Sequence, residues 1–182
     1  SGVQAMIMSA CQAGDKVILP RNAHKSAINA LILGGITPVY VQPEMNERLG
    51  IAMGVSVEKI KEAIALHPDA KAVFLINPTY YGASSDIESI VRLCHSHDMA
   101  VLVDEAHGAH LGISTNFPDS AIHLGADIVI QSLHKTMPSP TQTALLHING
   151  NIVEKKKINK FLSIFQTSSP SYLLIAGIDE AI

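Results

Sequence analysis

Short apolar runs alternate along the chain with longer stretches in which apolar residues recur at helical spacing. The runs predict strands over residues 16–19, 38–41, 73–76, 100–103, 128–130 and 144–146. The helical spacing predicts helices at the start of the chain, from residue 85 onward, and over residues 24–33, 56–67, 152–164 and 171–182. Ser56 is predicted to cap one helix, and Ser85 with Glu88 to form a capping box at another.

The predicted strands are apolar on both faces and alternate with helices. This pattern is typical of a three-layer α/β fold, with a mostly parallel sheet and helices on both faces. Such sheets place their chemistry in the loops that follow the carboxyl ends of the strands. These loops cover residues 20–25, 77–82, 104–110 and 131–138, and each contains polar side chains.

Composition narrows the class of protein. The 182 residues are 47% hydrophobic and 16% charged, which suits one domain with a buried sheet. The net charge of −3 gives no reason to expect nucleic acid, and no apolar run is long enough to cross a membrane. Without a recognisable signal peptide, we expect a cytoplasmic protein in which Cys11 and Cys94 are buried thiols rather than a disulfide.

Two charged residues follow neighbouring apolar runs. Asp104 ends the run 101–103, and Lys135 follows the run 128–133. Separately, the aspartate could cap a helix and the lysine could lie on the surface. A lysine buried beside a sheet would have a lowered pKa and could form a Schiff base. Together they suit pyridoxal phosphate (PLP), which needs an amine for its aldehyde and a carboxylate for its ring nitrogen.

Three segments resemble the Orn/Lys/Arg decarboxylase family of fold-type-I PLP enzymes, in its shorter bacterial form. They are Asp-Glu-Ala-His-Gly-Ala-His at 104–110, Ser-x-His-Lys-Thr at 132–136 and Arg-Asn-x-His-Lys-Ser at 21–26. The resemblance runs through nearly all of the chain. It implies that residues 1–182 are the central part of the PLP-binding large domain, without its upstream glycine-rich turn and its C-terminal small domain. Activity is therefore expected of the parent protein rather than of this segment alone.

The resemblance also implies roles for individual residues. Lys135 would hold the cofactor covalently, Asp104 would pair with its ring nitrogen, and His107 would approach its phenolic oxygen. His24 and Ala106 would pack on opposite faces of the ring. The phosphate would be held by Ser132 and His134, and by Thr167 and Ser168 reaching from a partner subunit. We therefore expect a homodimer or a higher homo-oligomer with a shared active site.

The implied reaction is decarboxylation of a basic amino acid to its amine and CO2, with arginine favoured over lysine and ornithine. Either Lys135 or His24 could return a proton to the substrate Cα. The alternatives are another fold-type-I reaction, such as that of an aminotransferase or a β-keto synthase, and a non-catalytic PLP-fold domain.

The sequence predicts less specific roles for several other polar residues. Thr79 and Tyr80 are expected to line the same pocket, and Arg21 could bind a phosphate or carboxylate. No metal site is predicted, because His107 and His110 lack further ligands of the usual zinc set. His110 is therefore read as structural, and the lysines 155–157 as a solvated helix face.

Overall fold

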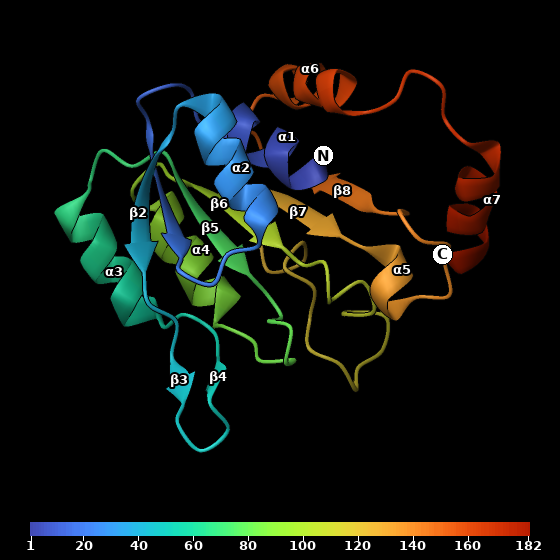
Figure 1. Cartoon of the computed structure of the whole chain (residues 1–182). Coiled ribbons are helices and arrows are strands. Elements are labelled where there is room, and N and C mark those ends of the chain that lie inside the picture. Colours follow the sequence, from blue (N-terminus) through green and yellow to red (C-terminus); the bar gives the residue numbers. More distant parts are fainter.

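The computed structural model describes residues 1–182 and contains a six-stranded sheet with helices on both faces (Figure 1). Across the sheet the strands lie in the order β2 (Thr37–Val41), β1 (Lys16–Pro20), β5 (Ala72–Ile76), β6 (Ala100–Asp104), β7 (Ile128–Gln131) and β8 (Leu145–Ile148). Neighbouring strands are parallel, except that β8 runs antiparallel to β7. The predicted three-layer α/β class with a mostly parallel sheet is confirmed.

The helices divide between the two faces of the sheet (Figure 1). One face is covered by α1 (Gly2–Ala10), α2 (Lys25–Gly34) and α6 (Lys155–Phe165), and the other by α3 (Val57–Leu66) and α4 (Ile87–His95). The single-turn α5 (Leu133–Thr136) follows β7, and α7 (Tyr172–Ala181) stands away from the sheet. The described chain has no helix long and apolar enough to cross a membrane.

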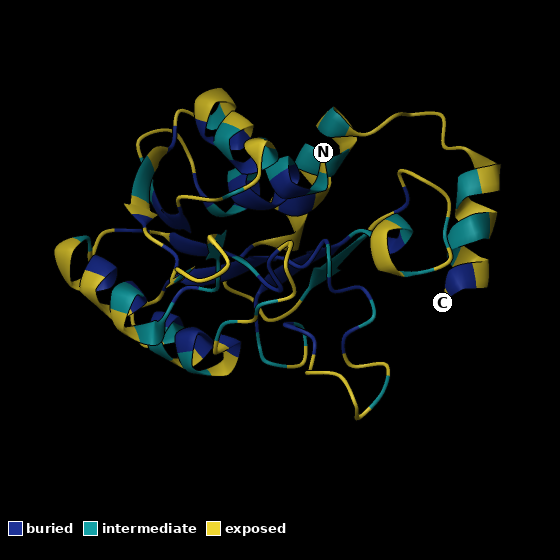
Figure 2. Cartoon of the chain, turned by 60° about the horizontal axis from the view of Figure 1, so that its bottom comes forward, coloured by how far each residue is buried: buried dark blue, intermediate teal, exposed yellow.

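Each face of the sheet has its own apolar core, because successive strand side chains point to opposite faces. On β5, Val73 belongs to the cluster under α3 and α4, while Phe74 belongs to the cluster under α1 and α2. Figure 2 shows buried residues concentrated in the sheet and on the inner sides of the helices. Cys11 and Cys94 are buried free thiols, as predicted.

The helix starts differ in part from the sequence predictions. The N-cap of α4 is Asp86, whose carboxylate accepts a hydrogen bond from the Ser89 amide at 3.0 Å, so the predicted capping box is wrong. Ser85 instead accepts a bond from the Val55 amide at 3.0 Å and ties together two loops distant in sequence. Ser56 occupies the N-cap of α3, but its side chain makes no capping bond.

A small hairpin outside the main sheet was not predicted. Its antiparallel strands are β3 (Met45–Asn46) and β4 (Ile51–Ala52), and it projects from the end of β2 (Figure 1). Strands of two residues are too short for alternation to reveal them.

A buried polar cluster anchors the loop that follows β6. The Glu105 side chain is fully buried and accepts hydrogen bonds from Ser120 Oγ at 2.7 Å, Gln131 Nε2 at 2.6 Å and the Ala121 amide at 2.8 Å. His147 lies 3.0 Å from the Gln131 side-chain oxygen and completes the cluster. Buried polar groups stabilise a fold only when their partners are present, so these residues depend on one another.

We expect Glu105→Ala to lower the free energy of unfolding by about 3 kcal/mol, because it leaves buried donors without an acceptor. Glu105→Gln keeps one acceptor oxygen and should cost less. Urea denaturation of both variants measures the difference, with the exposed Glu88→Ala as a control that should stay within about 0.5 kcal/mol of wild type. Equal stability of Glu105→Ala and wild type would contradict this role.

Candidate active site

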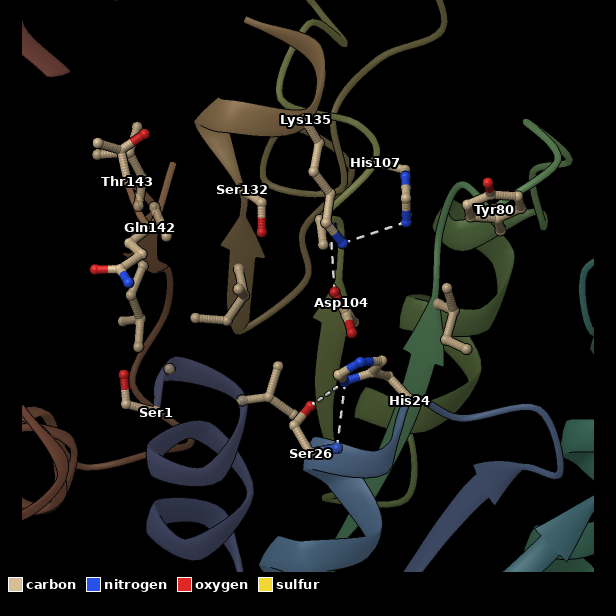
Figure 3. Close-up of a pocket in the computed structure, with 18 of the residues that line it drawn as sticks. Ser1, His24, Ser26, Tyr80, Asp104, His107, Ser132, Lys135, Gln142 and Thr143 are labelled. Atoms are coloured by element: carbon tan, nitrogen blue, oxygen red, sulfur yellow. Dashed lines mark hydrogen bonds between the residues drawn. The ribbon is translucent and has the colours of Figure 1, made fainter. Parts of the chain in front are cut away.

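A pocket of about 1190 Å³ opens at the edge of the sheet where β1, β5, β6 and β7 end. The loops after these four strands all contribute to its lining, as predicted. Their lining residues are Asn22, His24, Thr79, Tyr80, Tyr81, Asp104, Ala106, His107, Ser132 and Lys135. Figure 3 shows how the main polar side chains of this pocket lie.

Asp104 is the buried carboxylate of the pocket. It ends β6 opposite Ile130 of β7, is only 6% exposed, and accepts one hydrogen bond, from the Ala106 amide at 3.1 Å. Burial raises the pKa of Asp104 above its ordinary value; the Ala106 amide opposes this shift, and so do electrostatic interactions with Lys135, His24 and His107. The carboxylate has no ion-pair partner within 4.0 Å and is therefore poorly compensated.

Lys135 lies on α5, in the turn that follows β7. Its Nζ is 3.3 Å from His107 Nε2, and Figure 3 shows its side chain extending into the space above Asp104. Burial, and secondarily the Lys135 charge, lowers the pKa of His107. The Nε2 of its neutral ring can therefore accept a hydrogen bond from the Lys135 ammonium group. The sequence left open whether Lys135 is buried or lies on the surface; the residue is exposed, on the single turn of α5 at the rim of the pocket.

His24 occupies the N-cap of α2 and lies beside Asp104 in the pocket (Figure 3). Its Nδ1 accepts a hydrogen bond from the Ser26 amide at 3.2 Å and lies 2.9 Å from Ser26 Oγ. The ring is thereby fixed by the helix that it caps, and its other nitrogen remains available to the pocket.

The start of α1 forms another wall of the pocket. Ser1, Gly2 and Val3 line it, and Ser132 at the end of β7 lines it as well. A Cβ on Gly2 would lie 2.7 Å from Ile130 Cδ1, so the absence of a side chain lets the helix start lie close to β7. Free amides at a helix N-terminus beside a serine hydroxyl are suited to binding an anion.

Only some of the remaining predicted site residues line the pocket. Ala106 and Thr167 line it, whereas His134 and Ser168 do not. His134 Nδ1 bonds the Thr143 carbonyl at 2.9 Å, and Thr167 Oγ1 accepts a bond from the Ser169 amide at 3.1 Å. The phosphate-binding roles suggested for His134, Thr167 and Ser168 stay predictions.

Arg21 and His110 were left open by the sequence. The Arg21 guanidinium lies 4.7 Å from the centre of the Tyr40 ring, in a cation–π contact outside the pocket lining. His110 packs edge-on against Phe117, and its buried Nδ1 has no hydrogen-bond partner. No group of three or more metal-ligating side chains lies within the described chain.

Sequence reasoning missed several parts of the pocket wall. Gln142 lines it with a φ of 77°, a left-handed conformation that is uncommon outside glycine and that no sequence signal revealed. Apolar residues of the hairpin, α6 and α7 also contribute, namely Met45, Ala52, Leu162, Phe165, Leu174, Ile175 and Ile178. They come from elements whose position relative to the sheet is set by tertiary packing.

These groups include the amine and the carboxylate that PLP requires. An amine, a buried carboxylate with a free oxygen, and a helix start beside a serine share one pocket. They suit, respectively, an aldehyde, a protonated ring nitrogen and a phosphate. A buried and poorly compensated carboxylate such as Asp104 is typical of a functional site.

Comparison with known proteins gives one family and a set of similar folds. The family model described as Orn/Lys/Arg decarboxylase, major domain, matches residues 1–182. An arginine decarboxylase of Bacillus subtilis is 45% identical over 179 residues, covering 98% of this chain and 36% of that protein. A lysine decarboxylase of Pseudomonas aeruginosa is 27% identical, covering 92% of this chain and 25% of that protein. The chain thus spans about a third of the length of the Bacillus arginine decarboxylases that it matches.

Solved structures show the same fold at lower identity. The constitutive lysine decarboxylase of Escherichia coli superposes with a TM-score of 0.73 at 24% identity, covering 98% of this chain and 26% of that one. The Bacillus subtilis protein ntda, solved with the bound cofactor PMP, has a TM-score of 0.64 at 20% identity, covering 93% and 36%. An alanine aminotransferase of Pyrococcus furiosus has a TM-score of 0.65 at 16% identity, covering 89% and 42%.

We expect Asp104→Asn to stabilise the cofactor-free protein near neutral pH. A carboxyl whose pKa is higher in the folded chain binds more protons when folded, so its contribution to stability falls as the pH rises. Asparagine has no charge to desolvate and still accepts the Ala106 amide bond. The gain in free energy of unfolding should shrink as the pH falls toward 3.8, the ordinary value for this carboxyl, and vanish below it.

Urea denaturation at a series of pH values measures this difference. Asp119→Asn, on an exposed side chain, is the matched control and should show no such dependence. A variant of Asp104 that is no more stable than wild type near neutral pH would show that the buried carboxylate is already compensated.

Proposed function

Because the chain belongs to the Orn/Lys/Arg decarboxylase family, we propose that its pocket binds PLP and that the whole protein decarboxylates a basic amino acid. The observation that carries the proposal is Asp104, a buried carboxylate without an ion-pair partner, in the same pocket as Lys135. A protonated pyridine nitrogen would supply the missing positive charge. The described chain has no other carboxylate in the lining of this pocket.

The polar residues take distinct roles in this proposal. Lys135 provides the amine that holds the cofactor aldehyde and yields its place to the substrate amine. Asp104 keeps a proton on the ring nitrogen, and His107 approaches the phenolic oxygen. His24 and Ala106 pack on the two faces of the ring. When bound, PLP supplies the electron sink that stabilises negative charge at the substrate Cα as CO2 leaves.

The phosphate is assigned to the α1 end of the pocket. Ser132 and the first amides of α1 bind it there, since a helix N-terminus favours an anion. His134 would bind the phosphate together with Ser132, and Thr167 and Ser168 would reach the cofactor of a partner subunit in a homodimer. The lysine cluster 155–157 is exposed on α6 and takes no part in this site.

Arginine is the proposed substrate, ahead of lysine and ornithine. Four arginine decarboxylases of related bacteria are 42–45% identical to this chain, whereas two lysine decarboxylases are 26–27% identical. These relatives are longer than this chain, which covers 36% and 25% of two of them. An aminotransferase reaction would use the same amine and carboxylate, and the reaction product distinguishes it.

We expect the full-length protein, incubated with PLP and arginine, to release CO2 and agmatine in equal amounts, and to turn over lysine and ornithine more slowly. Product analysis by mass spectrometry and CO2 trapping measures this. Formation of a keto acid without CO2 would instead identify an aminotransferase. Failure to bind PLP at all would favour a non-catalytic domain with this fold.

We expect Lys135→Ala to lose both the visible absorption band of bound PLP and the decarboxylase activity, because no other lysine lines the pocket to hold the aldehyde. Absorption spectroscopy and CO2 release measure the two effects. Lys156→Ala, an exposed lysine on α6, is the control and should keep both. A Lys135→Ala protein that retains the band would place the cofactor elsewhere.

A further inference from the structure

The hydrogen bonds of His24 define which of its ring nitrogens carries a proton. The Ser26 amide lies 3.2 Å from His24 Nδ1, and Ser26 Oγ lies 2.9 Å from the same atom (Figure 3). A backbone N–H can only donate, so Nδ1 must accept with its lone pair. In a neutral ring the proton then lies on Nε2.

From these contacts we infer that the start of α2 locks His24 as a neutral ring with its proton on Nε2, and that Ser26 is the positioning residue. An imidazolium would carry a proton on each nitrogen, and its Nδ1–H would point at the Ser26 amide proton. Charging the ring would thus require the N-cap of α2 to open. His24 presents the pocket with a hydrogen-bond donor rather than with an acid.

This inference rests on the proposed function and decides between the two candidates for returning a proton to the substrate Cα. A neutral His24 could give up its Nε2 proton only by becoming an imidazolate anion, which is far too basic to form near neutral pH. Lys135 has no such barrier once the substrate has taken its place on the cofactor. As an ammonium group it breaks an N–H bond, forms the new C–H bond at Cα and is left as a neutral amine.

The position of His107 supports this assignment. Its Nε2 lies 3.3 Å from Lys135 Nζ and accepts a hydrogen bond there, so it can hold the ammonium form of the lysine within the pocket. The neutral amine left after proton transfer is also the form needed to hold the cofactor again as the product leaves. Lys135 would therefore hold the cofactor both before and after each round of the reaction.

Nitrogen NMR of the full-length protein labelled with 15N-histidine tests the inference without cofactor. The His24 signals, assigned by their loss in His24→Asn, should show a protonated Nε2 and a lone pair on Nδ1. A protonated Nδ1, alone or as imidazolium, would overturn it. Because neither PLP nor substrate is present, this readout is independent of whether the protein is a decarboxylase.

The role of Ser26 has its own test. Ser26→Ala keeps the amide donor but removes the 2.9 Å contact, so the His24 Nδ1 resonance should shift. Ser26→Thr restores a hydroxyl and should return the resonance to the wild-type position. An Nδ1 resonance that is the same in Ser26→Ala and wild type would show that the hydroxyl does not position the ring.

His24→Asn tests the assignment of the proton donor. Asparagine is a favoured N-cap, keeps an N–H donor and has no acidic proton. We expect one amine per CO2, as in wild type, with kcat reduced by no more than about 10-fold, whereas loss of a general acid costs about 10²-fold or more. A carbonyl by-product that replaces the amine, or a loss of 10²-fold or more in kcat, would assign the proton to His24. Absence of CO2 from the wild-type protein would contradict the proposed function and leave the NMR result standing.

Discussion

The site depends on the parallel pairing of β6 with β7. This pairing sets Asp104 opposite Ile130, so the strand that ends in the carboxylate lies beside the strand that leads into the lysine turn. Between them the chain runs through the loop of Glu105 to Ala121, which the buried Glu105 cluster fixes beneath the sheet edge. A shift of one residue in the register would turn Asp104 to the other face and separate the two groups.

Several residues of the pocket lower the stability of the ligand-free protein but are suited to binding a ligand. Asp104 is desolvated with a single hydrogen bond, His24 is committed to a helix cap, and Gln142 has a left-handed backbone. Such local costs gather at functional sites, because the rest of the fold holds the residues in place. The proposed cofactor would give these features one explanation, a cationic ring held between carboxylate and amine.

The sequence predicted the sheet, its helical layers and the edge that bears the site, because short apolar runs and helical spacing follow from burial alone. It also predicted that Asp104 and Lys135 share a pocket. The sequence did not predict features for which two neighbouring residues could take the same place, or which depend on long-range packing. Ser85 was read as part of a capping box because serine caps helices, yet Asp86 lies one residue closer to α4 and takes that place. The sequence left the burial of Lys135 open, because the walls around it are built by α6, α7 and the hairpin, whose positions depend on long-range packing.

The most direct test of the proposed site is to map the lysine that forms a covalent bond with PLP. The full-length protein is incubated with PLP, reduced with borohydride, digested and analysed by mass spectrometry. The proposed site predicts that the reduced cofactor is attached to Lys135. A cofactor found on Lys25 or on the exposed lysines of α6, with Lys135 unmodified, would contradict it.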